Sequence, residues 1–197
     1  DPKARGLGGV GVGLSAQREA KRREAKQDEF EEAVAHARSD GSMEDPLTTW
    51  IEYIRWFQDN YPSGSNELIM LFERCTREFK DDERYRNDER YLKVWIGYAD
   101  RLDNPSSVFK YLRENKIGEK LALYYIATAW TAERRGDFPL ADKAYSVGLE
   151  KRAEPVALLQ KRQSEFQRRM SRRWLDQAEK SRTEVDVDED EDELAAA

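Results

Sequence analysis

The stretch Gly136–Pro155, GDFPLADKAYSVGLEKRAEP, constrains the fold of this chain more than any other segment. Small and aromatic residues recur in it at helical spacing, which predicts a helix that another helix approaches closely. These residues are Gly136, Phe138, Ala141, Tyr145, Gly148 and Leu149. The preceding segment Leu121–Glu133 predicts a first helix, and Gly136 stands where a residue in the left-handed conformation would end it. Together the two segments predict a helical hairpin.

A hairpin of this kind is of tetratricopeptide type, and one alone cannot bury its own apolar face, so we expect similar pairs upstream. The sequence predicts one over Asp45–Phe79 and another over Asp88–Gly118, and Pro155 opens a last helix that ends near Lys180. The predicted fold is therefore all-α, with tandem tetratricopeptide-like helical hairpins stacked into a short superhelix and a C-terminal capping helix.

Several helix starts can be located from capping residues. Asp45 is expected to cap free backbone amides with its side chain, and Pro46 suits the first helical position because its missing N–H costs nothing there. Ser65 and Asp88 are expected to cap the next two helices, and Ser15 to begin a long N-terminal helix.

The two ends of the chain differ in composition from its middle. Residues 1–14 are glycine-rich and predict a flexible leader, and residues 15–44 predict a charged N-terminal helix. The tetratricopeptide-like domain is expected over residues 45–180. Residues 181–197 predict an acidic disordered tail, since eight carboxylates lie between Glu184 and Glu193 with no base among them. Without these eight, the chain's net charge of −6 becomes about +2.

No catalytic, metal or cofactor site is predicted. His36 is the single histidine and has no ligand partner near it, and Cys75 shares an apolar helical face with Leu71 and Phe72, which indicates a core thiol. The segment Gly6–Gly11 matches G-x-G-x-x-G, but it lacks the preceding strand that a nucleotide-binding loop requires. We therefore expect a protein that is not an enzyme and holds no cofactor.

Membrane insertion is not expected either. The longest apolar run, Leu121–Ala132, is too short to cross a bilayer, which takes about 20 residues.

A collinear set of motifs extends from Asp45 to Leu175. It comprises Asp45-Pro46-Leu47 with Trp50 and Asn60-Tyr61-Pro62; Asp88-x-Arg90-Tyr91-Leu92 with Trp95; Asn104-Pro105 with Tyr111-Leu112; Ile117-Gly118 with Tyr125-Ile126; Ala141-Asp142 with Gly148-Leu149; and Ala153-Glu154-Pro155 with Phe166-Gln167. This set resembles the N-terminal domain of the Mad/Bub spindle-assembly-checkpoint family. The long helical segment before Asp45 is more similar to the BubR-type branch than to the kinase branch.

The resemblance implies a non-enzymatic scaffold domain of a mitotic spindle assembly checkpoint protein. Such domains dock short helical motifs of an outer-kinetochore scaffold, and the parent chain would join the checkpoint complex and bind the activator of the anaphase-promoting complex, which it helps to inhibit. Location in the nucleus and cytoplasm, and at the kinetochore in mitosis, is implied too. The sequence does not begin with methionine, so we expect a fragment of a longer chain. It contains no Lys-Glu-Asn box, which is consistent either with truncation before Asp1 or with a family member that lacks this motif.

For the docking face we predict Ile96 and Tyr98. Helical spacing places Leu92, Trp95, Ala99 and Leu102 on one core-facing stripe, which leaves Ile96 and Tyr98 as outward apolar residues for a scaffold peptide. The alternative for Ile96 is packing against the next hairpin.

A second hypothesis is an RNA-processing scaffold of the half-tetratricopeptide class. Arginine pairs on the last helix, Arg168-Arg169 and Arg172-Arg173, could follow a phosphate backbone. The nearly neutral body and the scarcity of aromatic residues among these pairs argue against it, and no nucleic acid is expected as a partner.

Overall fold

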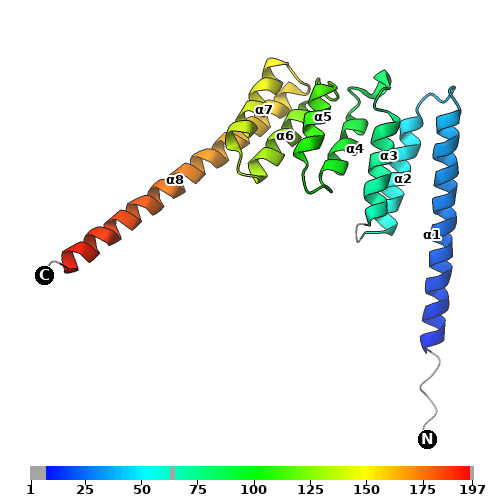
Figure 1. Cartoon of the computed structure of the whole chain (residues 1–197), viewed down its shortest axis with the longest axis horizontal. Helices are drawn as coiled ribbons and strands as arrows, with labels where there is room; N and C mark the ends of the chain where they lie inside the picture. The colour runs from blue at the N-terminus through cyan, green and yellow to red at the C-terminus, as the bar shows by residue number, and fades with distance from the viewer. Residues whose placement is uncertain (1–7, 63–64, 196–197) are drawn as a thin grey trace, which may run out of the picture. The chain divides into compact units, whose positions relative to one another are not determined.

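The computed structural model describes residues 8–62 and 65–195, with side chains over 13–62 and 65–182. Eight α-helices and one short 3-10 helix make up this part of the chain, and it contains no β-strand (Figure 1). The chain divides into two compact units, Asp1–Tyr111 and Leu112–Ala197, and the division falls within α5 (Ser106–Glu114). The predicted all-α fold of helical hairpins is confirmed.

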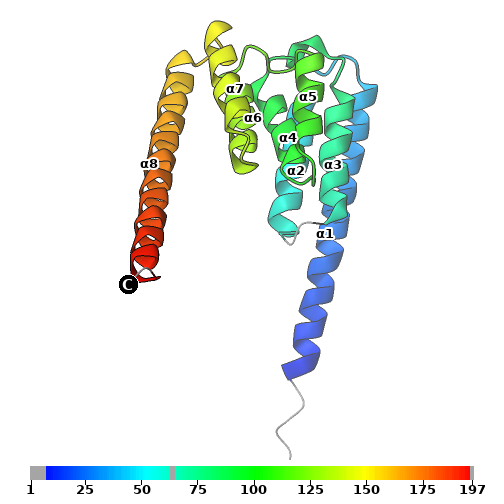
Figure 2. The same ribbon diagram turned by 60° about the vertical axis from the view of Figure 1, so that its left-hand side comes forward.

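In the first unit, α2 (Pro46–Asn60) and α3 (Asn66–Glu78) form the first hairpin, and the long helix α1 (Gly8–Ser39) packs along α2 (Figures 1 and 2). The Phe30 ring of α1 stacks on the Tyr53 ring of α2, with 5.1 Å between the ring centroids. The thin apolar stripe of α1 is thus enough to attach its C-terminal half to the hairpin.

The start of α2 differs from expectation in one respect. Pro46 occupies the first turn as predicted, but the Asp45 carboxylate caps no backbone amide. It accepts hydrogen bonds from the Tyr85 hydroxyl (2.8 Å), the Thr48 hydroxyl (2.7 Å) and the Arg90 guanidinium (2.8 Å). The predicted amide cap was wrong because an arginine and a tyrosine from later in the chain provide stronger partners for this carboxylate.

The second hairpin begins after a 3-10 turn, Glu83–Tyr85. Asp88 caps α4 (Glu89–Ala99) as predicted, since its carboxylate accepts from the backbone N–H of Arg90 at 2.8 Å. The predicted stripe on α4 is buried at Leu92, Trp95 and Ala99. This face fixes which side chains of α4 remain available at the surface.

In the second unit, α6 (Ala122–Arg134) and α7 (Phe138–Glu150) lie side by side as the predicted hairpin that contains Gly136, and α8 (Val156–Ala195) packs on both (Figures 1 and 2). Gly136 has a φ of +77°, so it is left-handed as predicted. A Cβ on Gly148 would lie 2.6 Å from the Tyr125 ring and 2.8 Å from Leu159. The predicted close approach of helices at this glycine is therefore correct.

Both ends of the described chain are more helical than expected. Helix α1 begins at Gly8 rather than at the predicted cap Ser15, and α8 continues to Ala195 where a disordered tail was predicted from residue 181. Adding a residue to an existing helix is much easier than nucleating one, so strong helix formers nearby extend the helix into weaker sequence. Residues 1–7 of the predicted leader and residues 196–197 of the predicted tail lie outside the described residues.

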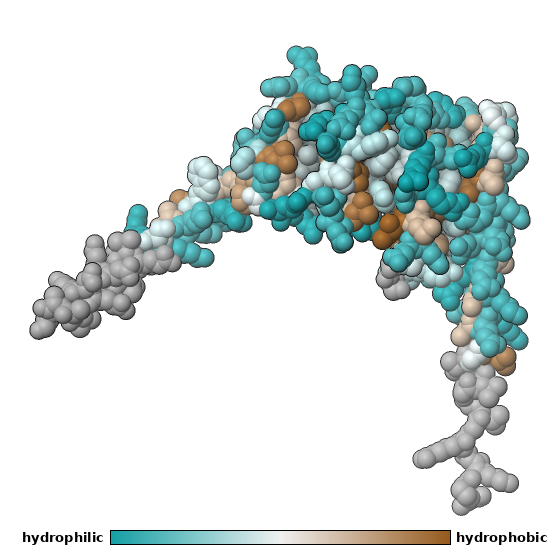
Figure 3. All heavy atoms as spheres, viewed as in Figure 1, coloured by the Kyte–Doolittle hydropathy of each residue, from teal (hydrophilic) through white to brown (hydrophobic). Residues whose placement is uncertain are grey.

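The visible surface is mostly hydrophilic, with separate hydrophobic side chains between the polar ones (Figure 3). Over the described residues, no helix combines the length and the apolar composition needed to span a membrane.

Candidate functional site

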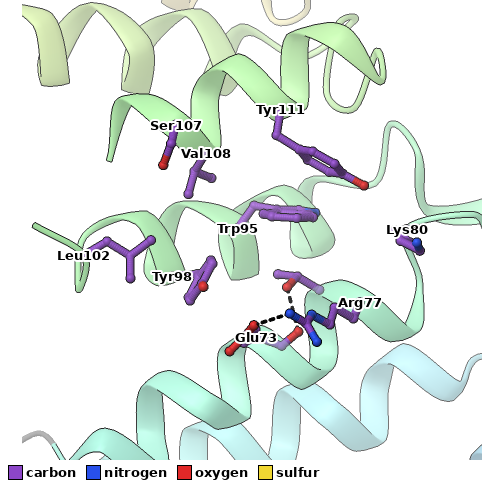
Figure 4. A pocket seen from close by; sticks show the side chains of 10 residues that line it. Glu73, Arg77, Lys80, Trp95, Tyr98, Leu102, Ser107, Val108 and Tyr111 are labelled. Carbon is purple, nitrogen blue, oxygen red and sulfur yellow. Dashed lines mark hydrogen bonds and ion pairs between the residues drawn. The ribbon is translucent and has the colours of Figure 1, made fainter. Parts of the chain in front are cut away.

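A hollow of about 500 Å³ lies in the first unit, between α3, α4 and α5 (Figure 4). We call it the aromatic pocket. Its apolar lining is Trp95, Tyr98, Leu102, Val108 and Tyr111, and its polar lining is Glu73, Thr76, Arg77, Lys80 and Ser107. Ligand-binding hollows commonly measure about 300–1,000 Å³, so this one has room for several side chains of a partner.

Trp95 forms the floor of the aromatic pocket. Its centroid lies 5.2 Å from that of Tyr111 on α5 and 6.4 Å from that of Tyr98 one turn further along α4. Only 7% of Trp95 is exposed, and its indole N–H forms no hydrogen bond of normal geometry within the described part of the chain. Aromatic rings held in this way offer a large rigid surface at little cost in side-chain entropy.

The rim on the α3 side is charged. Arg77 forms an ion pair with Glu73 at 2.6 Å (Figure 4), and Lys80 follows at the end of the helix. Burial raises the pKa of the Tyr98 hydroxyl, Glu73 raises it further and Arg77 lowers it. Tyr98 therefore stays neutral and presents its ring to the pocket and a hydroxyl near this ion pair.

The structure separates the two residues predicted for docking. Tyr98 is half-buried and lines the aromatic pocket, whereas Ile96 is half-buried but does not line it. Two residues apart on a helix are turned by about 200° from each other, so they cannot share one contact surface. Binding of a peptide by either residue stays a prediction.

Much of this pocket could not be predicted from the sequence. The sequence predicts Trp95 mainly as a core residue, yet it also forms the floor, and Val108 and Tyr111 complete the apolar lining from α5. The sequence does predict a short apolar helix in this region, but it does not show that this helix faces α4 across the pocket. An apolar floor with a charged edge can bind the apolar side of a peptide while pairing with its polar side. Among the described residues, no group of three or more His, Cys, Asp or Glu side chains could hold a metal ion.

Comparison with known proteins gives the family. Residues 25–149 match the model of the Mad3/BUB1 homology region 1. The mitotic spindle checkpoint component mad3 of Schizosaccharomyces pombe is 38% identical over 143 residues, which are 71% of this chain and 45% of that protein.

Two solved structures share the fold. A chain in a crystal structure of the mitotic checkpoint complex is 33% identical, with a TM-score of 0.72 over 81% of this chain and 72% of that one. The conserved N-terminal domain of the mitotic checkpoint component BUB1 is 28% identical, with a TM-score of 0.74 over 79% and 81% of the two chains.

The chain thus spans less than half the length of the mad3 relative. The family match removes the support for the RNA-processing hypothesis, since it covers both of the first two hairpins and most of the third. The match over residues 25–149 shows that this chain belongs to the Mad3/BUB1 family of mitotic spindle checkpoint proteins.

Proposed function

We propose that this chain is a non-enzymatic docking domain that binds a short amphipathic helix of an outer-kinetochore scaffold in the aromatic pocket. The observation that carries the proposal is the apolar floor of Trp95, Tyr98 and Tyr111 beside the ion pair of Glu73 and Arg77. An amphipathic helix places apolar anchors at i, i+3, i+4 and i+7, and these need an apolar groove with a polar edge.

The size and rigidity of the aromatic pocket support this mode of binding. A volume of about 500 Å³ exceeds what one side chain fills, which suits two or three anchors on successive turns of a helix. The indole of Trp95 is held between two aromatic neighbours, so little ordering is needed when a peptide arrives.

The parent protein, in this proposal, acts in the spindle assembly checkpoint as a member of the BubR-type branch. It joins the mitotic checkpoint complex, binds the activator of the anaphase-promoting complex through segments of the parent chain, and helps to inhibit that complex. It resides in the nucleus and cytoplasm and gathers at kinetochores in mitosis. The identity with mad3 and with a chain of the mitotic checkpoint complex supports this part.

Calorimetric titration of the 197-residue chain with a helical peptide from the kinetochore scaffold tests the docking role. Replacing a central aromatic anchor commonly costs about 2 kcal/mol, so we expect Tyr98→Ala to weaken binding roughly thirtyfold. Ile96→Ala is the matched control, since it shortens an apolar side chain on the same helix outside the pocket, and we expect it to change the affinity by less than about threefold.

Circular dichroism melting of both variants separates loss of binding from loss of folding. Full affinity in a folded Tyr98→Ala variant would reject the aromatic pocket as the docking site. A larger effect of Ile96→Ala than of Tyr98→Ala would move the docking face to the other side of α4.

A further inference from the structure

A second cavity lies wholly within the second unit, where the end of α5 and the following turn meet α6 and α7. We call it the basic pocket. Its volume is about 180 Å³. An engineered cavity of about 150 Å³ takes up one benzene molecule, so the basic pocket has room for one side chain of the size of leucine or phenylalanine.

The floor of the basic pocket is apolar. Tyr124, Tyr125 and Ala144 line it and are each at least 92% buried. The Tyr125 hydroxyl donates a hydrogen bond to the backbone carbonyl of Glu119 at 2.8 Å, so its polar end is already satisfied. Leu140, which is 43% exposed, stands at the mouth. A partner must therefore bring an apolar group to fill this space, because a polar group would lose its hydrogen bonds to water.

The rim of the basic pocket carries an excess of positive charge. Arg113, Lys116, Lys143 and Lys151 all line it, against the single carboxylate of Glu119. Lys151 forms an ion pair with Glu119. Within the part of the chain that the structure describes, the other three cations form no ion pair.

Outside the eight carboxylates near the C-terminus the chain nets only about +2, so this surplus is a local feature of the pocket. These three cations come from α5, from the turn after it and from α7, so the fold gathers them from separate segments around one apolar opening. Cations in this arrangement raise the local concentration of anionic partners and slow their release.

We propose that the basic pocket binds an acidic linear peptide that inserts one leucine or phenylalanine between flanking aspartates and glutamates. The apolar side chain fills the floor, and the carboxylates on both sides of it pair with Arg113, Lys116 and Lys143. This surface has its own lining, separate from that of the aromatic pocket, and it is a second docking site beyond the proposed function.

The shape of the basic pocket favours a peptide over other anionic partners. A single-stranded nucleic acid needs exposed aromatic faces on which to stack its bases, whereas Tyr124 and Tyr125 are buried. An anionic membrane surface needs a broad basic face with several exposed apolar groups, whereas here a single leucine stands at the mouth of a small hollow.

The test is a fluorescence anisotropy titration of the full 197-residue chain with a labelled probe peptide, Asp-Glu-Asp-Leu-Asp-Glu-Asp. Exposed charge pairs contribute up to about 1 kcal/mol each, so we expect Arg113→Glu combined with Lys143→Glu to weaken binding about tenfold. The matched control is Arg134→Glu combined with Arg172→Glu, which reverses two exposed cations of the same unit outside this lining. The affinity of this control for the peptide should stay within about twofold of the unchanged chain at 0.15 M salt, because salt screens charges over about 8 Å.

A second peptide, in which alanine replaces the leucine, tests the floor. Burying a leucine side chain is worth about 1.5–3 kcal/mol, so this peptide should bind at least tenfold more weakly to the unchanged chain. Leu140→Ser should weaken the leucine peptide and leave the alanine peptide unaffected. Amide chemical shifts of Thr128 and Val147, which line the pocket, should move on titration.

Three results would overturn the proposal. The first is equal binding of the leucine and alanine peptides, and the second is equal weakening by the pocket and the control substitutions. The third is no binding of the peptide while vesicles containing phosphatidylserine or a single-stranded RNA bind through Arg113 and Lys143. Tyr98→Ala leaves the basic pocket intact, so failure here and failure of the scaffold-docking role can be told apart.

Discussion

The Arg90 guanidinium lies 2.8 Å from the Asp45 carboxylate and joins the first turn of α4 to the residue that precedes α2. Tyr85 and Thr48 donate to the same carboxylate. The hydrogen bond from Arg90 is the largest cause that lowers the pKa of Asp45 from 3.8 to about 2. The ion pair thus links two hairpins through side chains that are 45 residues apart in the sequence.

This relationship predicts a pH dependence. Because the folded-state pKa of Asp45 lies below its unfolded value, the carboxylate stabilises the fold above pH 4, and the contribution is lost as the pH falls from about 4 to about 2. Both side chains are more than 40% exposed, so solvent screening reduces the contribution to about 1 kcal/mol. Urea unfolding of Asp45→Asn should show this deficit at pH 7 and almost none at pH 2. The matched control is Asp59→Asn, on the exposed side of α2 and outside this cluster of hydrogen bonds.

Gly148→Ala should destabilise the second unit. The new methyl group would lie within 3.0 Å of Tyr125 and Leu159, and both neighbours are buried and cannot easily move. Overpacking of this kind costs about 1–3 kcal/mol, which thermal unfolding should report as a clear drop in Tm. Gly41→Ala serves as the control, since nothing lies within 4 Å of its added Cβ. Equal Tm values for the two variants would contradict the close approach of Tyr125 and Leu159 to Gly148.

The attachment of α1 should depend on two neighbouring residues. Phe30 stacks on Tyr53, and Glu31 accepts two hydrogen bonds from Arg74, each at 2.8 Å. Replacing Phe30 and Glu31 by alanine should lower the free energy that holds α1 on the hairpin by about 2 kcal/mol. Hydrogen exchange of residues 25–39 should then be roughly thirtyfold faster, while exchange in α3 and α4 stays the same. Glu32→Ala, an exposed neighbour without these contacts, should leave the exchange unaltered.

Cys75 should be unreactive in the folded protein. It is fully buried, and burial, with a smaller effect of Glu78, raises its pKa, so very little thiolate is present at neutral pH. Labelling with Ellman's reagent should proceed at least about 1,000-fold more slowly in buffer than in denaturing urea, because only opened molecules react. Gln160→Cys places a thiol on an exposed position and should add one fast phase. Rapid labelling of the unchanged chain would contradict the buried assignment.

The hairpins could be predicted because their features are local. Gly136 and Gly148 have their roles through backbone conformation and helix contact, and both can be recognised from spacing within one segment. Ser65 and Asp88 cap helices through atoms two or three residues away, which sequence also records. Asp45 failed as an amide cap because its preferred partner, Arg90, comes from a distant segment.

The aromatic pocket could be predicted only in part for the same reason. Helical periodicity identifies Tyr98 as an outward residue of α4, but it cannot tell which side chains of α3 and α5 face it across space. Nothing in the sequence therefore places Tyr111 and Glu73 opposite Tyr98. Ile96 satisfied the same apolar criterion as Tyr98, and only the placement of the neighbouring helices separates the two.

The position of Trp95 gives the protein an intrinsic optical reporter. Trp130 and Trp174 are 54% and 74% exposed, whereas Trp50 and Trp95 are almost fully buried, and of these two Trp95 lines the aromatic pocket. Occupation of the hollow above it would change the blue edge of the emission spectrum without any attached dye. Association at this surface can thus be followed in stopped-flow experiments on the unmodified chain.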